Sequence, residues 1–344
     1  MPTTKINWEL LAVTRFFLAS VVMAGHLGPH DETGFLNWLA YFGGFEAVLG
    51  FLLISGFSIG KSISRDRENY FKRRVSRIYP VYLVALVTAI LVIRPPFNFN
   101  TTLNLGLNIF FLLQVFTINP FALPSWTLAL EVWMYALAPI LLKASFKRLN
   151  ILIYASFITF IIYTCGRTLL HWPYFQGTLF GINLILLAFG WIIGFAIAIF
   201  PDRVRINKFN VAFIYAAHIA LTTALAAAHS YKHHDIRNFL RGNGLQLLFQ
   251  SACLLWVYVV ILYNGRCKVF SGWIAKLFNL LGNISYPLYL VHLVVFIYFN
   301  RLGYRFGPVM VLGALLYSWL VYVVFDFYSK RRNRENLQVV AVPN

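Results

Sequence analysis

Charged residues are scarce in this sequence of 344 residues. Asp, Glu, Lys and Arg together make up 12% of the chain, whereas an average soluble domain carries about 25%. Because 60% of the residues are hydrophobic, too few polar side chains remain to cover the surface of a soluble fold. This shortage excludes a soluble enzyme and a disordered protein, and it predicts an integral membrane protein.

Cysteine and acidic residues are also in short supply. The three cysteines, Cys165, Cys253 and Cys267, are scattered and form no CxxC pair, which argues against a disulfide framework and a zinc site. Only 11 acidic residues oppose 29 Lys and Arg, which gives a net charge of +18. These basic residues lie mainly in short segments between apolar runs. We therefore expect them to face a lipid bilayer, and we expect no nucleic-acid partner.

Long apolar runs are abundant. A helix that crosses a bilayer needs about 20 mostly apolar residues. Apolar stretches occur near residues 8–27, 44–62, 78–94, 105–117, 124–142, 150–166, 178–200, 210–228, 245–263, 280–299 and 307–327. The polar segments between them are too short to form a domain. Residues 1–344 are therefore predicted to form one all-α, polytopic membrane domain with 10–11 spans.

The basic loops set the expected topology. Segment 61–77 holds seven Lys or Arg and is predicted to be cytoplasmic, whereas 28–43 has none and is predicted to lie outside. Eleven full spans cannot place the other basic loops inside, but ten can. The short stretch 105–117 is the best candidate for a re-entrant segment. Both termini then lie in the cytoplasm, and segment 229–244 lies outside.

Ionisable residues inside apolar runs are functional candidates, because charge is costly within a bilayer. Arg15 and His26 share the first run and are eleven residues apart, close to three helical turns, so both side chains face the same way. About 16 Å of helix axis would separate them. Two interpretations are open: a snorkelling Arg with an interfacial His, or a polar stripe that lines a cavity.

Two motifs lie near the predicted cytoplasmic loop. The run FLLISGFSIG contains Ser55 among small residues, which favours close helix packing or room for a ligand. The run RRVSRIYP places Arg74 and Arg77 on one helical face, beside Arg73. These arginines are topology anchors or a clamp for phosphate groups, whose oxygens suit the planar guanidinium.

A carboxylate lies in the middle of a later run. The sequence SWTLALEVWMY contains Glu131, with Tyr135 one turn later on the same helical face. A lone buried carboxylate must be neutral, or paired with a cation or with hydrogen-bond donors. Arg15, His26 and the arginines of RRVSRIYP are the candidate partners.

The last motif, SYPLYLVH, forms a polar stripe. Ser285, Tyr289 and His292 have spacing i, i+4 and i+7 on an otherwise apolar helix. The stripe is either a hydrogen-bonded part of the core or a part of a site. The histidines within 229–234 lie in a polar loop without an HExxH motif, so we expect no metal site.

The order of these motifs carries a resemblance. Arg-x10-His, FLLISGF, RRVSRIYP, SWTLALE and SYPLYLVH follow one another within residues 8–327. In this order they resemble the membrane acyltransferase-3 family, whose members O-acylate cell-surface and secreted sugars. The family's Trp-Ser-Leu-x-x-Glu pattern falls on Trp126 and Glu131, with Thr127 in place of Ser.

The resemblance implies a location, a donor and an acceptor. The family consists of bacterial inner-membrane enzymes that take an acyl group, most often acetyl, from cytoplasmic acyl-CoA. The acceptor is a saccharide or glycolipid hydroxyl. Acetyl-CoA would be a co-substrate, and no permanently bound cofactor is expected. The SGNH hydrolase-like domain that some members carry is expected to be absent.

The resemblance also assigns expected roles. Acyl transfer needs a base for the hydroxyl proton and donors for the developing oxyanion. His26 is the candidate base, and Glu131 either orients His26 or pairs with Arg15. Arg74 and Arg77, with Arg73, would hold the CoA phosphates. Candidates for lining the cavity or binding the acceptor are Ser55, Trp126, Tyr135, Ser285, Tyr289 and His292.

Two other classes of function compete with this one. A transporter or flippase for a lipid-linked sugar would also contain charged residues in a central cavity. That class explains neither the Arg-x10-His spacing nor the RxxR motif. A scaffold protein explains none of the ionisable residues inside the apolar runs.

Overall fold

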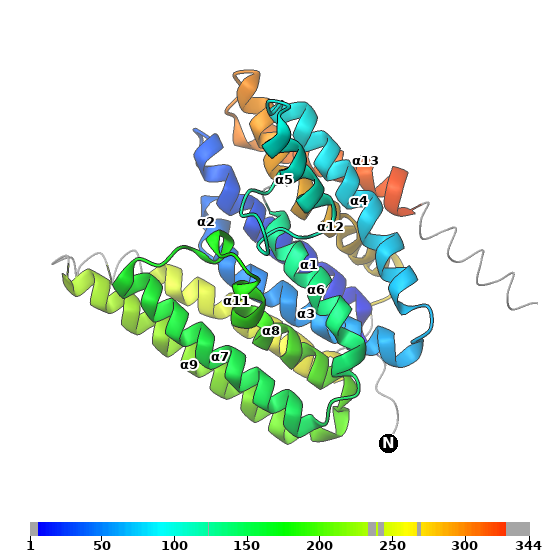
Figure 1. Ribbon diagram of the computed structural model, residues 1–344, viewed down its shortest axis with the longest axis vertical. Coiled ribbons are helices and arrows are strands. Elements are labelled where there is room, and N and C mark those ends of the chain that lie inside the picture. Colours follow the sequence, from blue (N-terminus) through cyan, green and yellow to red (C-terminus); the bar gives the residue numbers. More distant parts are fainter. Residues whose placement is uncertain (1–5, 123, 233–238, 240–243, 267–269, 328–344) are drawn as a thin grey trace, which may run out of the picture.

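The protein, seen here in a computed structural model, is built from helices (Figure 1). The structure describes residues 6–122, 124–232, 239, 244–266 and 270–327. The α-helices are α1 (Trp8–Leu27), α2 (Asn37–Ala40), α3 (Gly44–Arg65), α4 (Tyr70–Ile93), α5 (Phe99–Ile109), α6 (Ser125–Leu141), α7 (Phe146–Leu170), α8 (Ile182–Ile199), α9 (Val204–Lys232), α11 (Gly244–Tyr263), α12 (Gly272–Arg301) and α13 (Gly307–Val321). Among the described residues no β-strand occurs; the nearest approach to one is an isolated bridge between Leu113 and Thr117.

The number of spanning helices agrees with the sequence prediction. Within the described ranges, nine helices are long and apolar enough to cross a bilayer, namely α1, α3, α4, α7, α8, α9, α11, α12 and α13. Helix α6 is apolar but has only 17 residues. Together with α6 these helices make a bundle of ten. The predicted all-α polytopic fold is therefore confirmed.

The stretch 105–117 does not form a spanning helix. Helix α5 ends at Ile109 after 11 residues, and the chain then turns. The buried Asn108 holds this turn, because its Nδ2 donates to the carbonyl oxygen of Asn119 (3.1 Å) and its Oδ1 accepts from the amide of Phe121 (3.2 Å). These bonds satisfy backbone groups that no helix pairs, which irregular backbone at membrane depth requires.

The loops at one end of the bundle are tied together around Asp31. Its carboxylate accepts hydrogen bonds from the amides of Gly307 (2.9 Å), Thr33 (2.9 Å) and Phe35 (2.7 Å). Burial alone would raise the pKa of Asp31, but these hydrogen bonds outweigh it and hold the pKa below its usual range. The amide of Gly307 starts α13, so Asp31 caps that helix from a distant part of the chain.

The opposite end is closed by the segment before α1. The amide of Asn7 donates to Asn264 Oδ1 (2.7 Å), and Asn264 Nδ2 donates back to the carbonyl of Asn7 (3.0 Å). Segment 61–77 lies at this same end and consists of the last turn of α3, the turn 66–69 and the first two turns of α4. The C-terminal tail and most of segment 229–244, whose sides of the membrane the sequence predicted, lie outside the described ranges.

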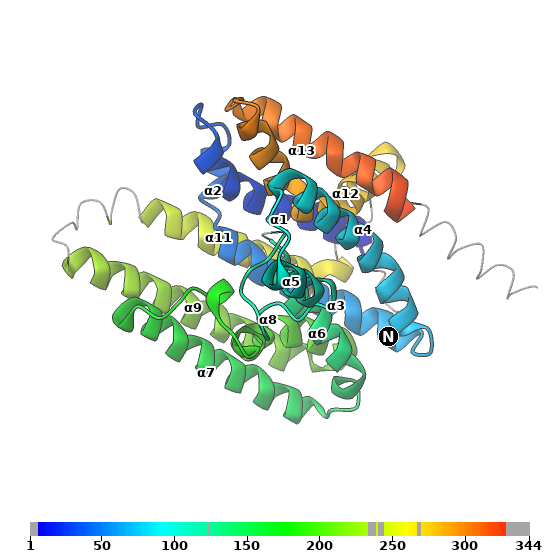
Figure 2. The ribbon, with the colours of Figure 1, turned by 45° about the horizontal axis from the view of Figure 1, so that its top comes forward.

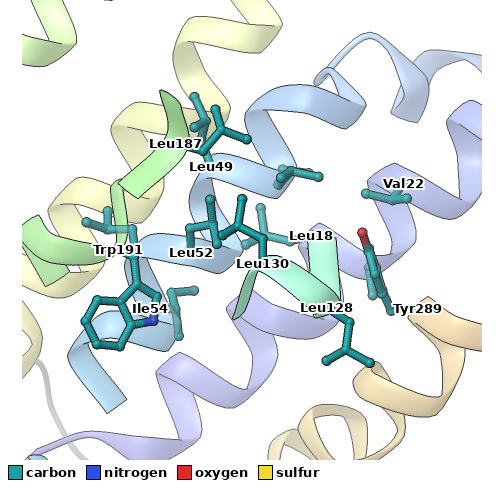
Figure 3. Close-up of a cluster of buried hydrophobic side chains, with 14 of the residues drawn as sticks. Leu18, Val22, Leu49, Leu52, Ile54, Leu128, Leu130, Leu187, Trp191 and Tyr289 are labelled. Atoms are coloured by element: carbon teal, nitrogen blue, oxygen red, sulfur yellow. The ribbon is translucent and has the colours of Figure 1, made fainter. Parts of the chain in front are cut away.

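The helices form two flanks around a central group. Helices α7 and α9 run side by side on one flank, and α4, α12 and α13 lie on the other (Figures 1 and 2). Helices α1, α3, α6 and α8 lie between them. In the buried apolar cluster of this central group, Leu49 and Leu52 of α3 meet Leu187 and Trp191 of α8 (Figure 3). Apolar burial against α8 therefore orients one face of α3.

Small residues allow α3 and α8 to cross closely. A Cβ atom added to Gly56 would lie 1.9 Å from the carbonyl oxygen of Trp191, and one added to Gly194 would lie 2.0 Å from that of Leu53. No side chain fits between these backbones. The two sequence interpretations of FLLISGFSIG therefore hold on different faces of α3. Its glycines pack against α8, whereas Ser55 faces a cavity described below.

This crossing gives a prediction for stability. We expect Gly194→Ala to destabilise the protein by about 1–3 kcal/mol, because the added methyl group forces the helices apart. Gly190→Ala is the matched control on the same helix, since the heavy atom nearest to its added Cβ would be 3.8 Å away. Melting temperatures of both variants in one detergent test the expectation. Equal melting temperatures would contradict the close crossing.

Helices α1 and α12 lie side by side and run in the same direction. Gly282 packs on Ala12, where a Cβ on the glycine would lie 2.4 Å from the alanine Cβ. Fourteen residues further along α1, His26 contacts His292 of α12. Residue numbers increase along both helices from the first contact to the second. The polar stripes of α1 and α12 therefore face each other over much of their length.

Candidate active site

One cavity brings together residues from five helices, α1, α3, α4, α6 and α12. Its volume is about 120 Å³, and one side is open. Its polar lining consists of Arg15, Ser55, Ser58, Arg74, Arg77, Thr127, Glu131, Tyr135, Ser285, Tyr286 and Tyr289. Eight of these are residues that the sequence motifs singled out as site candidates, so the fold joins five motifs into one site. We call it the arginine cavity.

Three guanidinium groups line the arginine cavity. Arg15 comes from α1, whereas Arg74 and Arg77 come from successive turns of α4, and Arg77 is exposed. Arg74 Nη2 donates to Ser62 Oγ (2.7 Å). The Nε atoms of Arg15 and Arg74 are buried and have no hydrogen-bond partner in the described part of the chain. Buried donors without partners are uncommon in folded proteins, and they indicate a site that takes a ligand or water.

No acidic side chain forms an ion pair with these arginines among the described residues. The two ion pairs found there join Arg73 to Asp66 and Arg305 to Glu32, both outside the arginine cavity. Glu131 is the one carboxyl group in the lining. The arginine cavity therefore carries more positive than negative charge, and an anionic ligand would be attracted to it.

Glu131 belongs to a network of hydroxyl groups. Its Oε2 accepts hydrogen bonds from Ser55 Oγ (3.1 Å) and from the hydroxyl of Tyr135. The hydroxyl oxygens of Ser55 and Tyr135 lie 3.0 Å apart, and the hydroxyl of Tyr70 donates to the carbonyl of Tyr135 (3.1 Å). The direct partners of Glu131 are thus hydroxyls. Arg15 lines the same cavity, which brings it near this carboxyl group.

His26 lies apart from Glu131, near the other end of α1. Its Nδ1 lies 2.8 Å from Nε2 of His292, which is fully buried. The group that contacts and orients His26 in this structure is therefore His292, and not Glu131 as one of the sequence hypotheses had it. The length of α1 explains why His26 lies apart from the arginine cavity. Eleven residues of this helix place His26 about 16 Å from Arg15 along the helix axis.

A polar stripe on α12 connects the arginine cavity to the two histidines. Ser285 and Tyr289 line the arginine cavity, and the hydroxyl of Tyr289 bonds to Thr127 of α6. His292 follows Tyr289 by three residues, about 4.5 Å further along the helix. The spacing that the sequence predicted for Ser285, Tyr289 and His292 thus forms one continuous face toward α1 and α6.

Two of the predicted site residues lie elsewhere. Arg73 is bound to Asp66, with one guanidinium nitrogen on the carboxylate and another on the Asp66 carbonyl (2.6 Å). Trp126 is buried in the hydrophobic core and does not line the arginine cavity. A helix has one face toward a given neighbour, so adjacent residues such as Arg73 and Arg74 point to different surroundings.

Three polar residues of the arginine cavity, Ser58, Thr127 and Tyr286, were not among the site residues predicted from the sequence. Ser58 lines it with a buried Oγ that has no partner among the described residues. Tyr286 also lines it, and its hydroxyl donates to the carbonyl of Ile78 (3.0 Å). The signal for Ser58 was present, because it follows Ser55 by three residues and so shares its helical face.

Two other ionisable residues of the apolar helices, Glu46 and His218, line a second cavity. Glu46 and His218 are buried there, with Arg167 stacked on the ring of Tyr174 (4.6 Å from guanidinium carbon to ring centroid). This cavity lies beside the start of α3, whereas the arginine cavity lies toward its end. The two groups of charged residues are therefore separate sites.

Comparisons with known proteins agree with the motif order. The model of the acyltransferase domain family, acyltransferase-3, matches residues 10–327. The chain is 28% identical over 236 residues to the ORF330 protein of Acidianus two-tailed virus, whose name assigns it, provisionally, to the acetyltransferases. That alignment covers 68% of this chain and 67% of the viral protein. No solved structure matches the chain. Because the family match spans nearly all of the helical bundle and every motif of the arginine cavity, the chain belongs to the acyltransferase-3 family and is a multi-pass membrane acyltransferase.

Proposed function

We propose that this protein moves an acyl group, most simply acetyl, from cytoplasmic acyl-CoA to a hydroxyl of a saccharide or glycolipid. We place it in the cytoplasmic membrane of a bacterium, with loop 61–77 and both termini on the cytoplasmic side. Family membership supports the reaction class. The basic residues of 61–77 support the orientation, because positive loops remain in the cytoplasm.

The observation that carries the donor assignment is the excess of guanidinium groups in the arginine cavity. CoA presents phosphate groups, and arginine binds phosphate oxygens in pairs through its planar fork. Arg77 is exposed at the mouth, and Arg15 and Arg74 have unpartnered donors within. The phosphates would bind at the mouth, and the thin pantetheine arm would follow α1 toward His26. Its length is similar to the Arg15–His26 separation of about 16 Å.

The chemistry at the far end of this path needs a base. His26 is half-buried and held at Nδ1 by His292. It would accept the proton of the acceptor hydroxyl while that oxygen attacks the thioester carbonyl. The C–S bond then breaks, and the departing thiolate of CoA takes the proton from His26. The products are an O-acylated acceptor and free CoA thiol, and His26 returns to its neutral form.

Acetyl transfer by the purified protein tests the function. The protein in detergent is mixed with radiolabelled acetyl-CoA, and the release of CoA thiol is measured with and without cell-surface glycans as acceptors. We expect thiol release and labelled glycan. Mass spectrometry of surface glycans from cells with and without the gene then identifies the acceptor. A protein that binds a lipid-linked sugar but releases no thiol would contradict the proposal and favour a flippase.

The arginines at the mouth give a further prediction. We expect Arg74→Ala and Arg77→Ala each to weaken CoA binding by about tenfold, since a charge-assisted hydrogen bond contributes roughly 1.5–3 kcal/mol. Lys should replace Arg77 poorly if the contact is bidentate, and added salt should reduce the loss caused by Arg77→Ala. Arg73→Ala is the matched control, because Arg73 faces Asp66 outside the arginine cavity. Unchanged CoA affinity in both variants would make these arginines topology anchors only.

A further inference from the structure

We propose that His292 is a positioning residue that fixes the tautomer of His26 and so presents Nε2 of His26 as the catalytic base. The inference rests on the proposed function, because it assigns a partner to the base of that reaction. It is carried by the geometry of two imidazole rings from helices that are 266 residues apart in the sequence.

The two rings meet edge to edge. Their planes are inclined by 16° and their centroids are 5.1 Å apart, while Nδ1 of His26 and Nε2 of His292 are only 2.8 Å apart. That centroid separation is about as large as a 2.8 Å contact between ring edges permits, so both nitrogens lie close to the line that joins the centroids. The contact is therefore an in-plane hydrogen bond and not a face-to-face stack.

The other nitrogen of His292 determines which atom donates. Nδ1 of His292 lies 2.8 Å from the carbonyl oxygen of Leu288, one turn earlier on α12. A carbonyl oxygen only accepts, so Nδ1 of His292 carries a hydrogen and donates it. In the neutral ring, Nε2 of His292 is then left with a lone pair and must accept. Nδ1 of His26 therefore carries the hydrogen in the bond between the two rings.

This assignment leaves a lone pair on one atom, Nε2 of His26. Among the described residues, His26 makes its hydrogen bond through Nδ1 and not through that atom. When Nε2 accepts the hydroxyl proton, the ring becomes an imidazolium that still donates from Nδ1 to His292. No hydrogen bond of the pair has to break during the reaction, which is the benefit that a fixed tautomer brings to a catalytic histidine.

Burial keeps this arrangement in place. His292 has no exposed surface, and the ring of Phe296 packs edge-on against it at 5.9 Å between centroids. Close packing of α1 on α12 at Ala12 and Gly282 holds the two helices together below the pair. A buried imidazole that already donates to its own helix has one remaining hydrogen-bonding function, which is to accept from His26.

Two variants of one residue test the proposal. His292→Phe keeps a ring of similar shape but accepts no hydrogen bond, and His292→Gln offers an amide oxygen near the former Nε2. We expect His292→Phe to lower kcat by on the order of 10²-fold with little change in the KM for acetyl-CoA, because an unguided tautomer disables the base. His292→Gln should recover about tenfold of that loss or more. If His292 had only a packing role, His292→Phe would have the higher kcat of the two variants.

Three controls keep the outcomes distinct. His218→Phe removes another buried histidine, one outside the arginine cavity, and should leave kcat near the wild-type value. In a His26→Ala background, His292→Phe should cause no further loss, since His292 acts through His26. CoA binding to each variant shows that it is folded, and if His292→Phe does not fold, the rate of His292→Gln relative to wild type decides.

The proposal is overturned if His292→Phe keeps kcat within about threefold of wild type, or if a folded His292→Gln is as slow as His26→Ala. An additive loss in the double variant would also overturn it. Failure of the proposed function would appear differently, because the wild-type protein itself would then release no thiol from acetyl-CoA.

Discussion

Replacing His26 with alanine is expected to lower acyl transfer at least about 10²-fold, the usual effect of losing a positioned proton acceptor. The protein should still bind acyl-CoA, because the guanidinium groups of Arg15, Arg74 and Arg77 line a cavity that does not include His26. The loss should therefore appear in kcat while the KM for acetyl-CoA changes little. A residue that only packs would show the reverse: less folded protein and normal turnover per folded molecule.

The measurement is acetyl transfer per mole of detergent-purified protein, together with CoA affinity. His30→Ala is a suitable control, because His30 lies one turn further along and contacts Asn300 and not His292. Near-normal turnover of His26→Ala would remove this residue from the mechanism and leave Glu131 or His292 as the candidate base.

Replacing Glu131 with alanine is expected to cost about 2–4 kcal/mol of stability, because two half-buried donors lose their acceptor. The hydroxyls of Ser55 and Tyr135 both donate to its Oε2. The variant would also leave the arginine cavity with guanidinium groups and no carboxyl group. Mutual repulsion of these groups adds to the loss, and an anion in the cavity would relieve it.

Glutamine at this position separates hydrogen bonding from charge. Glu131→Gln keeps an oxygen that accepts from Ser55 and Tyr135 but removes the negative charge. We expect its melting temperature to lie well above that of Glu131→Ala, and CoA to stabilise it more than it stabilises the wild type. If Glu131→Ala has the same melting temperature as the wild type, the hydrogen-bond network of Glu131 contributes little to stability. If CoA stabilises Glu131→Gln no more than the wild type, the electrostatic argument is wrong.

Much of the fold follows from patterns that are local in sequence. Runs of about 20 apolar residues predict spanning helices without reference to their neighbours, and such runs correspond to nine helices of the described chain and to α6. The stretch 105–117 was too short and too polar to span, and the chain turns there after Ile109. Helical periodicity also placed Arg74 with Arg77, because residues three apart share a face.

The sequence predicted which residues belong to the candidate site but not which of them contact one another. Charges inside apolar runs are costly, so Arg15, Glu131 and His292 could be singled out from hydropathy alone. Which of them meet depends on how α1, α6 and α12 pack, and that is a property of contacts between segments more than a hundred residues apart. Glu131 therefore found hydroxyl partners that the list of candidate cations did not include.

The sequence by itself determined the membrane class, the span count, the family and the helical face that each polar residue occupies. These depend on composition and on spacing along a single helix, which no neighbour can change. Only the tertiary structure decided that the partner of His26 is His292 and that Arg73 lies outside the arginine cavity. A one-residue rotation of a helix turns a side chain by 100°, so packing chooses among faces that the sequence leaves equally available.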